Sequence, residues 1–490
     1  MIIRFTISTF FLFASVSLAI GQIEPLAFTY GDPGITERGI KVVEDEAGNF
    51  LFVGDRYVIL DTSGAQPANV DLEYFKISPH GEVIWSGYMD STLLDGGISV
   101  LAEAGGGYTL LTKHCDNVLG GAGCTRQNPR LYRLDGDGNI LWQTTYYSGD
   151  IALAANFVKT PDGGYAIMGV TSKYSELGDL FLLKVDANGA EVWEAIVPAT
   201  GGRAFDVAPA SGGGYYIAGS SIETNGRTGL VSKISESGEV LWTQYYGKAS
   251  FNGKLLSPFG DGFGLMLTNI PTDFISKELM RMDADGGLIW EKDLVDDIDR
   301  PTSAVATEDG VVVTGLDEIV SADDKVAKVV KYDLNGNLVW TKTHDPYPDY
   351  YEHPTDIIST ASGFVIAGFT ELADTVIYVY PEDLMLFLID QNGDLDSLET
   401  PNSVTETGVL PTVLVYPNPA TDFVVFQLSG NQGEEYELLI FNTLGQVCKN
   451  RRFSGSAFRL DRDGLPNGLY SFEIRSLKNE MIAKGKLILE

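Results

Sequence analysis

Short runs of alternating apolar and polar residues, separated by glycine-rich turns, make up most of this chain. Residues 155–193 show the pattern clearly. Ala155–Lys159, Tyr165–Val170 and Leu180–Val185 are three such runs, and a fourth contains Trp193. Asp-Gly-Gly and Asp-Ala-Asn-Gly turns connect them, and glycine there supplies the positive φ that tight hairpins need. The pattern therefore predicts units of four short antiparallel strands.

Two signatures show that this unit repeats. Every tryptophan follows a glycine by four residues, in the pairs Gly81 and Trp85, Gly138 and Trp142, Gly189 and Trp193, Gly238 and Trp242, Gly286 and Trp290, and Gly336 and Trp340. A turn leading into an apolar strand occurs seven times, at Gly48, Gly105, Asp162, Gly212, Asp261, Asp309 and Ser362. Seven repeats of four antiparallel strands predict an all-β fold, a seven-bladed β-propeller.

The seventh unit lacks its tryptophan strand. Its last turn, Asp390–Gly393, is present, but no tryptophan follows it. The segment Leu26–Asp32 aligns with Trp242–Gly247, with Leu26 in the tryptophan position. We therefore expect the N-terminal segment to complete the last blade as its outer strand, which closes the ring and removes a free sheet edge.

The ends of the chain differ from the repeats. Residues 1–21 have the charge, apolar stretch and small residues of a secretory signal peptide, and no other stretch is apolar and long enough to span a membrane. The expected order is a signal peptide, a propeller over residues 22–398, a polar linker over 399–409, and a small Ig-like β-sandwich over 410–490. This order predicts an exported protein without a transmembrane segment after the signal is removed.

Candidate binding residues lie on the side of the propeller that is expected to carry the longer loops, one of them from Lys113 to Arg130. The loop between residues 344 and 353 is acidic and tyrosine-rich, and tyrosines there can stack on sugar rings while carboxylates accept hydroxyl hydrogen bonds. The alternative is a loop packed by its own aromatic side chains. His344 and His353 are expected to be exposed loop histidines, with an acid–base or metal pair as the alternative. The candidate ligand-binding residues are Tyr347, Tyr350, Tyr351, Asp345 and Asp349.

Charge and cysteines restrict the partners. The formal net charge is −33, which argues against nucleic acid and anionic membrane surfaces as partners. Calcium is the one ion that this acidity leaves open. Cys115 and Cys124 lie in one glycine-rich segment of an exported protein and are expected to form a disulfide, whereas Cys448 is expected to be a buried thiol.

No catalytic residue, metal site or cofactor is predicted. The chain has four histidines and contains neither a Gly-x-Ser-x-Gly elbow nor a His-Glu-x-x-His helix. Turns such as Asp135–Gly138 and Asp283–Gly286 resemble parts of a calcium loop, but no liganding glutamate follows at the required spacing. We therefore interpret these segments as hairpin turns.

The last 80 residues carry four ordered motifs. They resemble the type A C-terminal sorting domain of type IX secretion cargo, and the repeats loosely resemble the Gly-Trp propellers of exported bacterial proteins. An ordinary Ig-like module is the alternative. The resemblance implies recognition by the outer-membrane translocon and a secreted or outer-surface location on a Gram-negative bacterium. The motif residues are Tyr416, Pro417, Asn418 and Pro419, then Gly445, then Gly468 and Tyr470, then Lys484 and Lys486.

Two functions remain open at this point. The first is a secreted or surface-displayed binding protein for carbohydrate or another protein. The second is an extracellular hydrolase or lyase with its site on the long-loop face or in the central channel. The absence of a catalytic motif favours the first, and convergent carboxylates in the channel would favour the second.

Overall fold

The computed structural model describes most of the chain after the N-terminal segment. The described residues are 27–30, 36–58, 69–79, 81–89, 96–118, 124–148, 150–224, 226–246, 252–269, 276–318, 325–345, 350–372, 382–395, 413–416, 423–428, 435–442, 447–454, 457–462, 464–466, 468–476 and 481–489. All secondary-structure elements assigned within these described residues are β-strands. They fall into two compact units, Met1–Leu398 and Glu399–Glu490. The predicted signal peptide and linker lie outside the described residues.

Four-stranded antiparallel sheets build the first unit. Six of them each consist of four consecutive strands. The first three are β2 (Thr36–Glu44), β3 (Phe50–Val58), β4 (Asn69–Ile77) and β5 (Val83–Met89); β6 (Gly96–Ala102), β7 (Tyr108–Val118), β8 (Cys124–Leu134) and β9 (Ile140–Thr145); and β10 (Ala152–Lys159), β11 (Tyr165–Thr171), β12 (Asp179–Val185) and β13 (Glu191–Val197). The next three are β14 (Arg203–Pro209), β15 (Tyr215–Glu223), β16 (Gly226–Ile234) and β17 (Val240–Tyr246); β18 (Asn252–Phe259), β19 (Gly262–Asn269), β20 (Ser276–Met282) and β21 (Leu288–Asp293); and β22 (Arg300–Thr307), β23 (Gly310–Glu318), β24 (Lys325–Asp333) and β25 (Leu338–His344).

The remaining sheet of this unit joins the two ends of the propeller region. It has the order β1 (Ala27–Tyr30), β28 (Glu382–Asp390), β27 (Gly363–Leu372) and β26 (Tyr350–Ser359). β1 pairs antiparallel with β28, from Ala27 opposite Phe387 to Tyr30 opposite Leu384. The predicted closing strand is therefore confirmed for its described part, Ala27–Tyr30.

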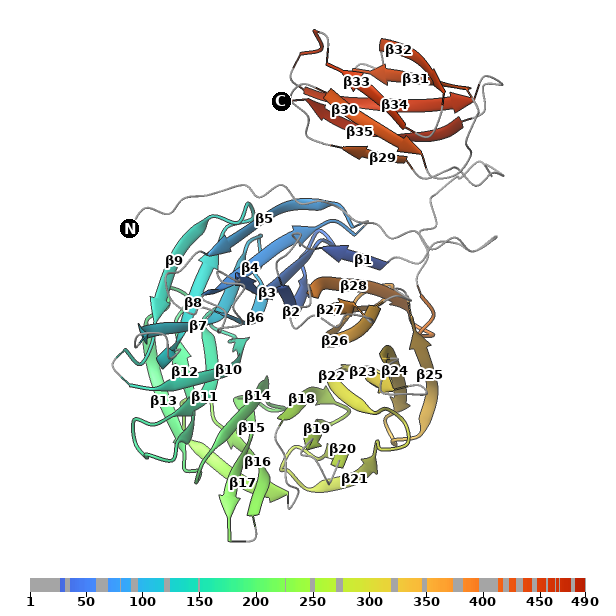
Figure 1. Ribbon diagram of the computed structural model, residues 1–490. Coiled ribbons are helices and arrows are strands. Elements are labelled where there is room, and N and C mark those ends of the chain that lie inside the picture. Colours follow the sequence, from blue (N-terminus) through green and yellow to red (C-terminus); the bar gives the residue numbers. More distant parts are fainter. Residues whose placement is uncertain are drawn as a thin grey trace. The chain divides into compact units, whose positions relative to one another are not determined.

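The sheets stand radially around a common centre (Figure 1). Their first strands, β2, β6, β10, β14, β18, β22 and β26, line the middle, and each contacts the next in this order, with β26 contacting β2. Apolar side chains of neighbouring sheets form shared cores, so that Tyr30 and Phe75 belong to one core with Leu384. The apolar face of each sheet is thus buried against its neighbours.

A tyrosine hydrogen bond repeats between neighbouring sheets. The hydroxyl of Tyr146 donates to the carbonyl oxygen of Gly189 at 3.0 Å, and that of Tyr246 donates to the carbonyl oxygen of Gly286 at 3.1 Å. Tyr30 makes the same bond to Gly81, at 2.8 Å. Because the acceptor is the turn glycine of the next sheet in each case, β1 acts as the outer strand of its sheet in the same way as β9 and β17.

Each tryptophan packs beneath the turn glycine of the next sheet. Gly138 has a φ of +83°, and a Cβ there would lie 3.1 Å from the indole of Trp85. The indole N–H of Trp85 also donates to the carbonyl oxygen of Gly136 at 3.0 Å. Positive φ and close approach both require glycine. The other pairs are Gly189 and Trp142, Gly238 and Trp193, Gly286 and Trp242, Gly336 and Trp290, and Gly393 and Trp340.

The acidic turns are held by their own carboxylates. Oδ1 of Asp135 accepts the backbone N–H groups of Asp137 at 3.0 Å and Asn139 at 2.8 Å. Asp283 binds the N–H groups of Asp285 and Gly287 in the same way. These bonds agree with the interpretation of such segments as hairpin turns.

The second unit contains two sheets that share one apolar core. The first is β29 (Val413–Tyr416), β30 (Phe423–Leu428) and β33 (Ala457–Asp461); the second is β32 (Val447–Ser454), β31 (Glu435–Phe441), β34 (Gly468–Ser476) and β35 (Met481–Leu489). Phe426 from the first sheet packs edge-on against Phe472 from the second, with ring centroids 5.0 Å apart. The unit is thus a small all-β body with its own core.

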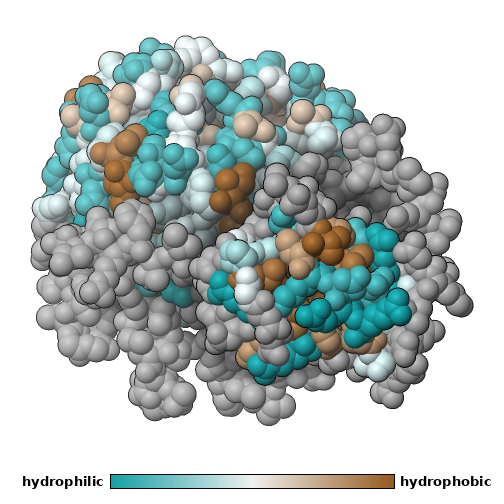
Figure 2. Space-filling view, turned by 90° about the horizontal axis from the view of Figure 1, so that it is seen from above, coloured by the Kyte–Doolittle hydropathy of each residue, from teal (hydrophilic) through white to brown (hydrophobic). Residues whose placement is uncertain are grey.

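Two predictions of local structure are wrong. Cys448 was expected to be buried, but it is exposed on β32 because the neighbouring residues of this strand also face solvent. The segment expected as a loop between Lys113 and Arg130 is largely strand, since β7 extends to Val118 and β8 begins at Cys124. On the face shown in Figure 2, the coloured surface is mostly hydrophilic with separate hydrophobic patches.

Candidate functional site

A ring of polar side chains surrounds the centre of the propeller region. Each inner strand contributes one residue at the same register position, opposite a residue of the second strand of its sheet, such as Val53 on β3 or Ala367 on β27. In six of the seven strands a shift in register comes directly before this residue, and such a bulge re-aims the side chain. The ring consists of Lys41, Ser99, Asn156, Asp206, Lys254, Ser303 and Asp356.

A glycine in the second strand makes room for the bulge. A Cβ at Gly368 would lie 2.1 Å from the carbonyl oxygen of His353 on the inner strand, and one at Gly219 would lie 2.6 Å from that of Arg203. The two backbones therefore approach too closely for any side chain. This contact explains the glycine that ends several copies of the apolar strand signature.

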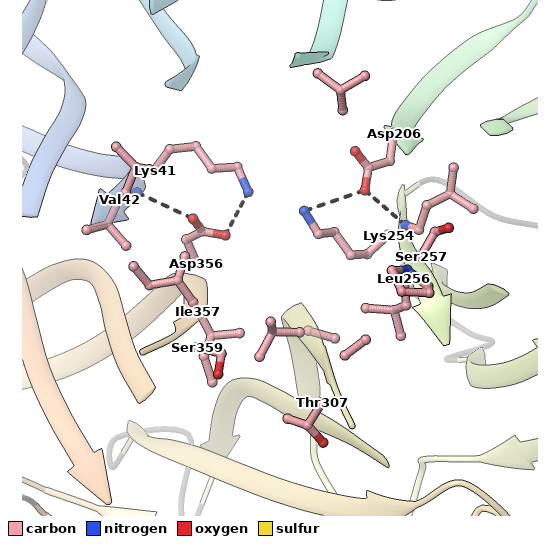
Figure 3. A pocket seen from close by; sticks show the side chains of 18 of the residues that line it. Lys41, Val42, Asp206, Lys254, Leu256, Ser257, Thr307, Asp356, Ile357 and Ser359 are labelled. Atoms are coloured by element: carbon pink, nitrogen blue, oxygen red, sulfur yellow. Dashed lines mark hydrogen bonds and ion pairs between the residues drawn. The ribbon is translucent and has the colours of Figure 1, made fainter. Parts of the chain in front are cut away.

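Two ion pairs hold the ring together. Nζ of Lys41 lies 2.8 Å from Oδ1 of Asp356, and Nζ of Lys254 lies 3.5 Å from Oδ2 of Asp206 (Figure 3). Both aspartates are buried, and the side chains of both lysines are partly exposed to the channel. Burial lowers the pKa of Lys41, against the opposing effect of Asp356, and nearby Lys254 lowers it further. Burial also acts to lower the pKa of Lys254, but Asp206 and Asp356 outweigh it and the pKa is raised.

The ring separates two cavities. The turn-side chamber, of about 1500 Å³, has apolar walls formed by residues two positions after the ring, including Val43, Leu101, Val158 and Ile358. The loop-side chamber, of about 410 Å³, is lined by the first residues of the inner strands and the last residues of β3 and β27. Lys41, Asn156, Asp206 and Lys254 line both.

The loop-side chamber combines aromatic and charged groups. The guanidinium of Arg38 lies 5.5 Å from the ring centre of Tyr57 and 5.4 Å from that of Phe369. It also binds Glu382 through two hydrogen bonds, with 2.7 Å between Nη2 and Oε1. Phe205 and Asn252 complete the lining on the opposite side. The chamber therefore offers flat apolar faces beside donors and acceptors.

Asp55 is a second buried carboxyl of this chamber, besides Asp206. Its Oδ1 accepts the backbone N–H of Gly97 at 2.8 Å, and its Oδ2 lies 3.8 Å from Nζ of Lys113. Burial raises the pKa of the Asp55 carboxyl, while Lys113 and the Gly97 N–H oppose this. Burial also raises the pKa of Tyr57. Both groups therefore favour their neutral forms more than exposed side chains do.

The predicted tyrosine cluster is only partly described. Tyr350 and Tyr351 begin strand β26, whereas a loop was expected there, because the inner strand pairs with β27 up to Leu372. Nζ of Lys325 lies 5.0 Å from the ring centre of Tyr351. Asp345 is exposed, and Tyr347 and Asp349 lie outside the described residues. Their predicted role in ligand binding stays a prediction.

The two histidines of this segment are not exposed. His344 ends β25 and is 4% exposed, and its ring lies 5.6 Å from that of Phe387. His353 stacks on Phe369 at 4.7 Å and lies 3.3 Å from Oε2 of Glu371. Burial lowers the pKa of each histidine to about 4. The expectation of exposed loop histidines is therefore wrong, because both residues lie on strands that pack into the sheets.

The predicted disulfide, and the questions of metal sites and membrane spans, concern other parts of the chain. Cys115 is buried on β7, and Cys124 begins the strand paired with it, so the disulfide stays a prediction compatible with this hairpin. No group of three or more His, Cys, Asp or Glu side chains suited to a metal ion occurs in the ranges that the structure describes. Among these ranges, none of the elements is a helix long and apolar enough to cross a membrane.

Five of the sorting-motif residues lie on strands of the second unit. Tyr416 ends β29, Gly468 begins β34, and Lys484 and Lys486 lie on β35. Tyr470 is buried and donates its hydroxyl to the carbonyl oxygen of Pro466 at 2.9 Å. The rest of the motif, Pro417, Asn418, Pro419 and Gly445, lies outside the described residues.

Comparison with protein families identifies both parts of the chain. Residues 414–490 match the family described as the secretion system C-terminal sorting domain. The chain therefore carries a type IX sorting tail, which places the protein outside the cell, either released or surface-attached. Residues 227–395 match the family of the outer membrane protein assembly factor BamB, so this region is similar to a BamB-type β-propeller. A search of curated proteins finds no match to this chain.

Solved structures show distant likeness to the fold. The extracellular region of plexin A4 is 9% identical, with a TM-score of 0.45 over 95% of this chain and 67% of that chain. Pyrococcus horikoshii acylaminoacyl peptidase is 9% identical, with a TM-score of 0.43 over 81% of this chain and 59% of that chain. An ulvan lyase is 10% identical, with a TM-score of 0.44 over 74% of this chain and 97% of that chain. At these values the likeness says nothing about activity.

Proposed function

We propose that this protein is an exported seven-bladed propeller that binds an extracellular carbohydrate in its loop-side chamber. The observation that carries the proposal is the composition of this chamber. Tyr57 and Phe369 present aromatic side chains in the same cavity as the hydrogen-bonding groups of Arg38 and Asn252. The sorting tail supports delivery of this chamber to the cell exterior.

The chemistry of a sugar fits this lining. A sugar ring has an apolar face that stacks on an aromatic side chain and hydroxyl groups that need donors and acceptors at its edge. The volume, about 410 Å³, lies within the range of small-ligand sites in proteins. The raised pKa values of Asp55 and Tyr57 favour their neutral forms, which can form hydrogen bonds with uncharged hydroxyl groups.

Binding is favoured over hydrolysis by the contacts of the two ring aspartates. Glycoside hydrolysis uses two carboxyl groups, one of them a protonated acid with a raised pKa. Asp206 is instead held by Lys254 and two backbone N–H groups, and Asp356 by Lys41 and one backbone N–H group. Protein donors therefore already occupy much of the hydrogen-bonding capacity of both carboxylates.

The predicted tyrosine cluster extends the proposed site. β26 begins on the loop side with Tyr350 and Tyr351 and continues to His353, which stacks on Phe369 in the chamber wall. A glycan longer than one sugar would run from the chamber toward this end of the strand. We therefore keep Tyr350 and Tyr351 as secondary contacts.

The proposal is tested with the full secreted chain on a glycan array. We expect binding of a subset of glycans and a loss of about tenfold, or ~1.4 kcal/mol, in Tyr57→Ala. Tyr174→Ala is the matched control, because this tyrosine is exposed and lies outside the chamber. The proposal is wrong if no glycan binds, or if Tyr57→Ala binds as tightly as the wild type.

A further inference from the structure

We propose that Lys41 and Lys254 form an oxyanion site at the floor of the loop-side chamber, and that the ligand is a sugar carrying one carboxylate or sulfate group. This inference rests on the proposed function, because the sugar enters the same chamber. It adds the ligand class, an acidic sugar. The two lysines come from β2 and β18, which lie in different parts of the ring.

The geometry brings the two ammonium groups together. In Figure 3 the side chains of Lys41 and Lys254 extend toward one another across the channel, with their aspartate partners behind them. Lys254 is one of the causes that lower the pKa of Lys41, as expected for two cations that face each other. Both line the loop-side chamber. A group that reaches this floor therefore meets two amino groups at once.

The acceptor groups at this floor, the carboxylates of Asp206 and Asp356, are already bound by protein donors. Asp206 accepts from the backbone N–H groups of Val207 and Leu255, both at 2.9 Å, and from Nδ2 of Asn156 at 2.5 Å, besides its ion pair with Lys254. The aspartate lone pairs are therefore largely used. Asp356 is held in the same way, by Lys41, the hydroxyl of Ser303 at 3.1 Å and the backbone N–H of Val42 at 3.4 Å.

The lysines keep donors for a ligand. An ammonium group has three N–H donors, and within the described residues each lysine makes one ion pair with an aspartate. Both lysine side chains line the chamber, so that their remaining N–H groups can donate to a ligand there. An oxyanion placed between them would accept these donors and remove the repulsion between the two ammonium groups.

The negative charge of the protein limits the number of negative charges that the ligand can carry. The ring contains two lysines and two aspartates, so it has no net formal charge, and the whole chain carries −33. A polyanion would therefore be repelled by the rest of the protein. A sugar with a single oxyanion, inserted into the chamber with that group at the floor, avoids most of this repulsion.

The test is a titration of the full chain, followed by ligand-observed NMR, with four sugars. The probes are glucuronic acid, its methyl ester, glucose 6-sulfate and glucose. We expect the wild type to bind glucuronic acid at least tenfold more tightly than its ester, and glucose 6-sulfate more tightly than glucose. Glucuronic acid alone showing the preference would assign the site to carboxylates, and the sulfate alone would assign it to sulfated sugars.

Variants locate the site. Lys254→Met should remove the preference for the acidic sugar over its ester. Lys328→Met is the matched control, since Lys328 makes a 2.8 Å ion pair with Asp317 and does not line either chamber. The inference is overturned if glucuronic acid binds the wild type no more tightly than its ester and glucose 6-sulfate binds no more tightly than glucose, and the carbohydrate proposal then survives. If none of the four sugars nor any array glycan binds, both proposals fail.

Discussion

Replacing Tyr30 tests whether the N-terminal strand closes the propeller. Tyr30 is 2% exposed, and its ring lies 5.2 Å from that of Phe75 on the neighbouring sheet. Truncation of a large buried aromatic side chain costs about 3–5 kcal/mol. Tyr30→Phe removes only the hydrogen bond to the Gly81 carbonyl, and the expected cost is about 1 kcal/mol. We therefore expect a large loss of stability in Tyr30→Ala and a small one in Tyr30→Phe.

The assay is equilibrium urea unfolding of the full chain, followed by tryptophan fluorescence. Tyr146→Ala and Tyr146→Phe are the matched controls, because Tyr146 is equally buried and makes the same bond to Gly189. Similar losses at both positions are expected if β1 is a true outer strand. A normal unfolding midpoint in Tyr30→Ala, beside a lowered midpoint in Tyr146→Ala, would refute the closure of the ring by β1.

Three further predictions concern other parts of the fold. Gly138→Ala should lower the melting temperature and cost more than about 1 kcal/mol, because its φ is +83° and the new Cβ would meet Trp85; an unchanged melting temperature would contradict this packing. The folded-state pKa of His344, about 4, lies below its ordinary 6.5, so the unfolded chain binds a proton first. The resulting stability is present above pH 6.5 and is lost as the pH falls toward 4, by at most about 3 kcal/mol; a wild type and a His344→Gln variant with the same pH dependence would disprove it. In unreduced protein, mass mapping should show Cys115 linked to Cys124, while Cys448 reacts with maleimide; a labelled Cys115 would rule out the disulfide.

Much of the fold follows from local signals in the sequence. Turn glycines and tryptophans mark the strands because a positive φ and a large ring packed against the next sheet are each tied to one position of the unit. The closing strand was predictable for the same reason, since Tyr30 occupies the position of Tyr246 in the repeat. Strand lengths were less predictable, because a segment such as Cys115–Val118 becomes a strand only when its partner strand is long enough to pair with it.

Most residues of the candidate site could not be predicted from the sequence. The ring residues differ in type, and Lys41, Asn156 and Asp206 share only a register position that depends on a bulge. The glycine opposite the bulge, as in Gly54 and Gly368, was the available signal, but its meaning needs the paired strand. His344 and His353 were misassigned because burial depends on which sheet a segment joins, and neighbouring residues in the sequence do not reveal this.

The location of a bound sugar tests the central proposal most directly. A crystal of the full chain soaked with the tightest glycan from the array would show where the ligand lies. We expect its electron density in the loop-side chamber, against Tyr57 and Phe369, with an acidic group at Lys41 and Lys254. Density on the outer strands or in the turn-side chamber, with the loop-side chamber empty, would contradict the account.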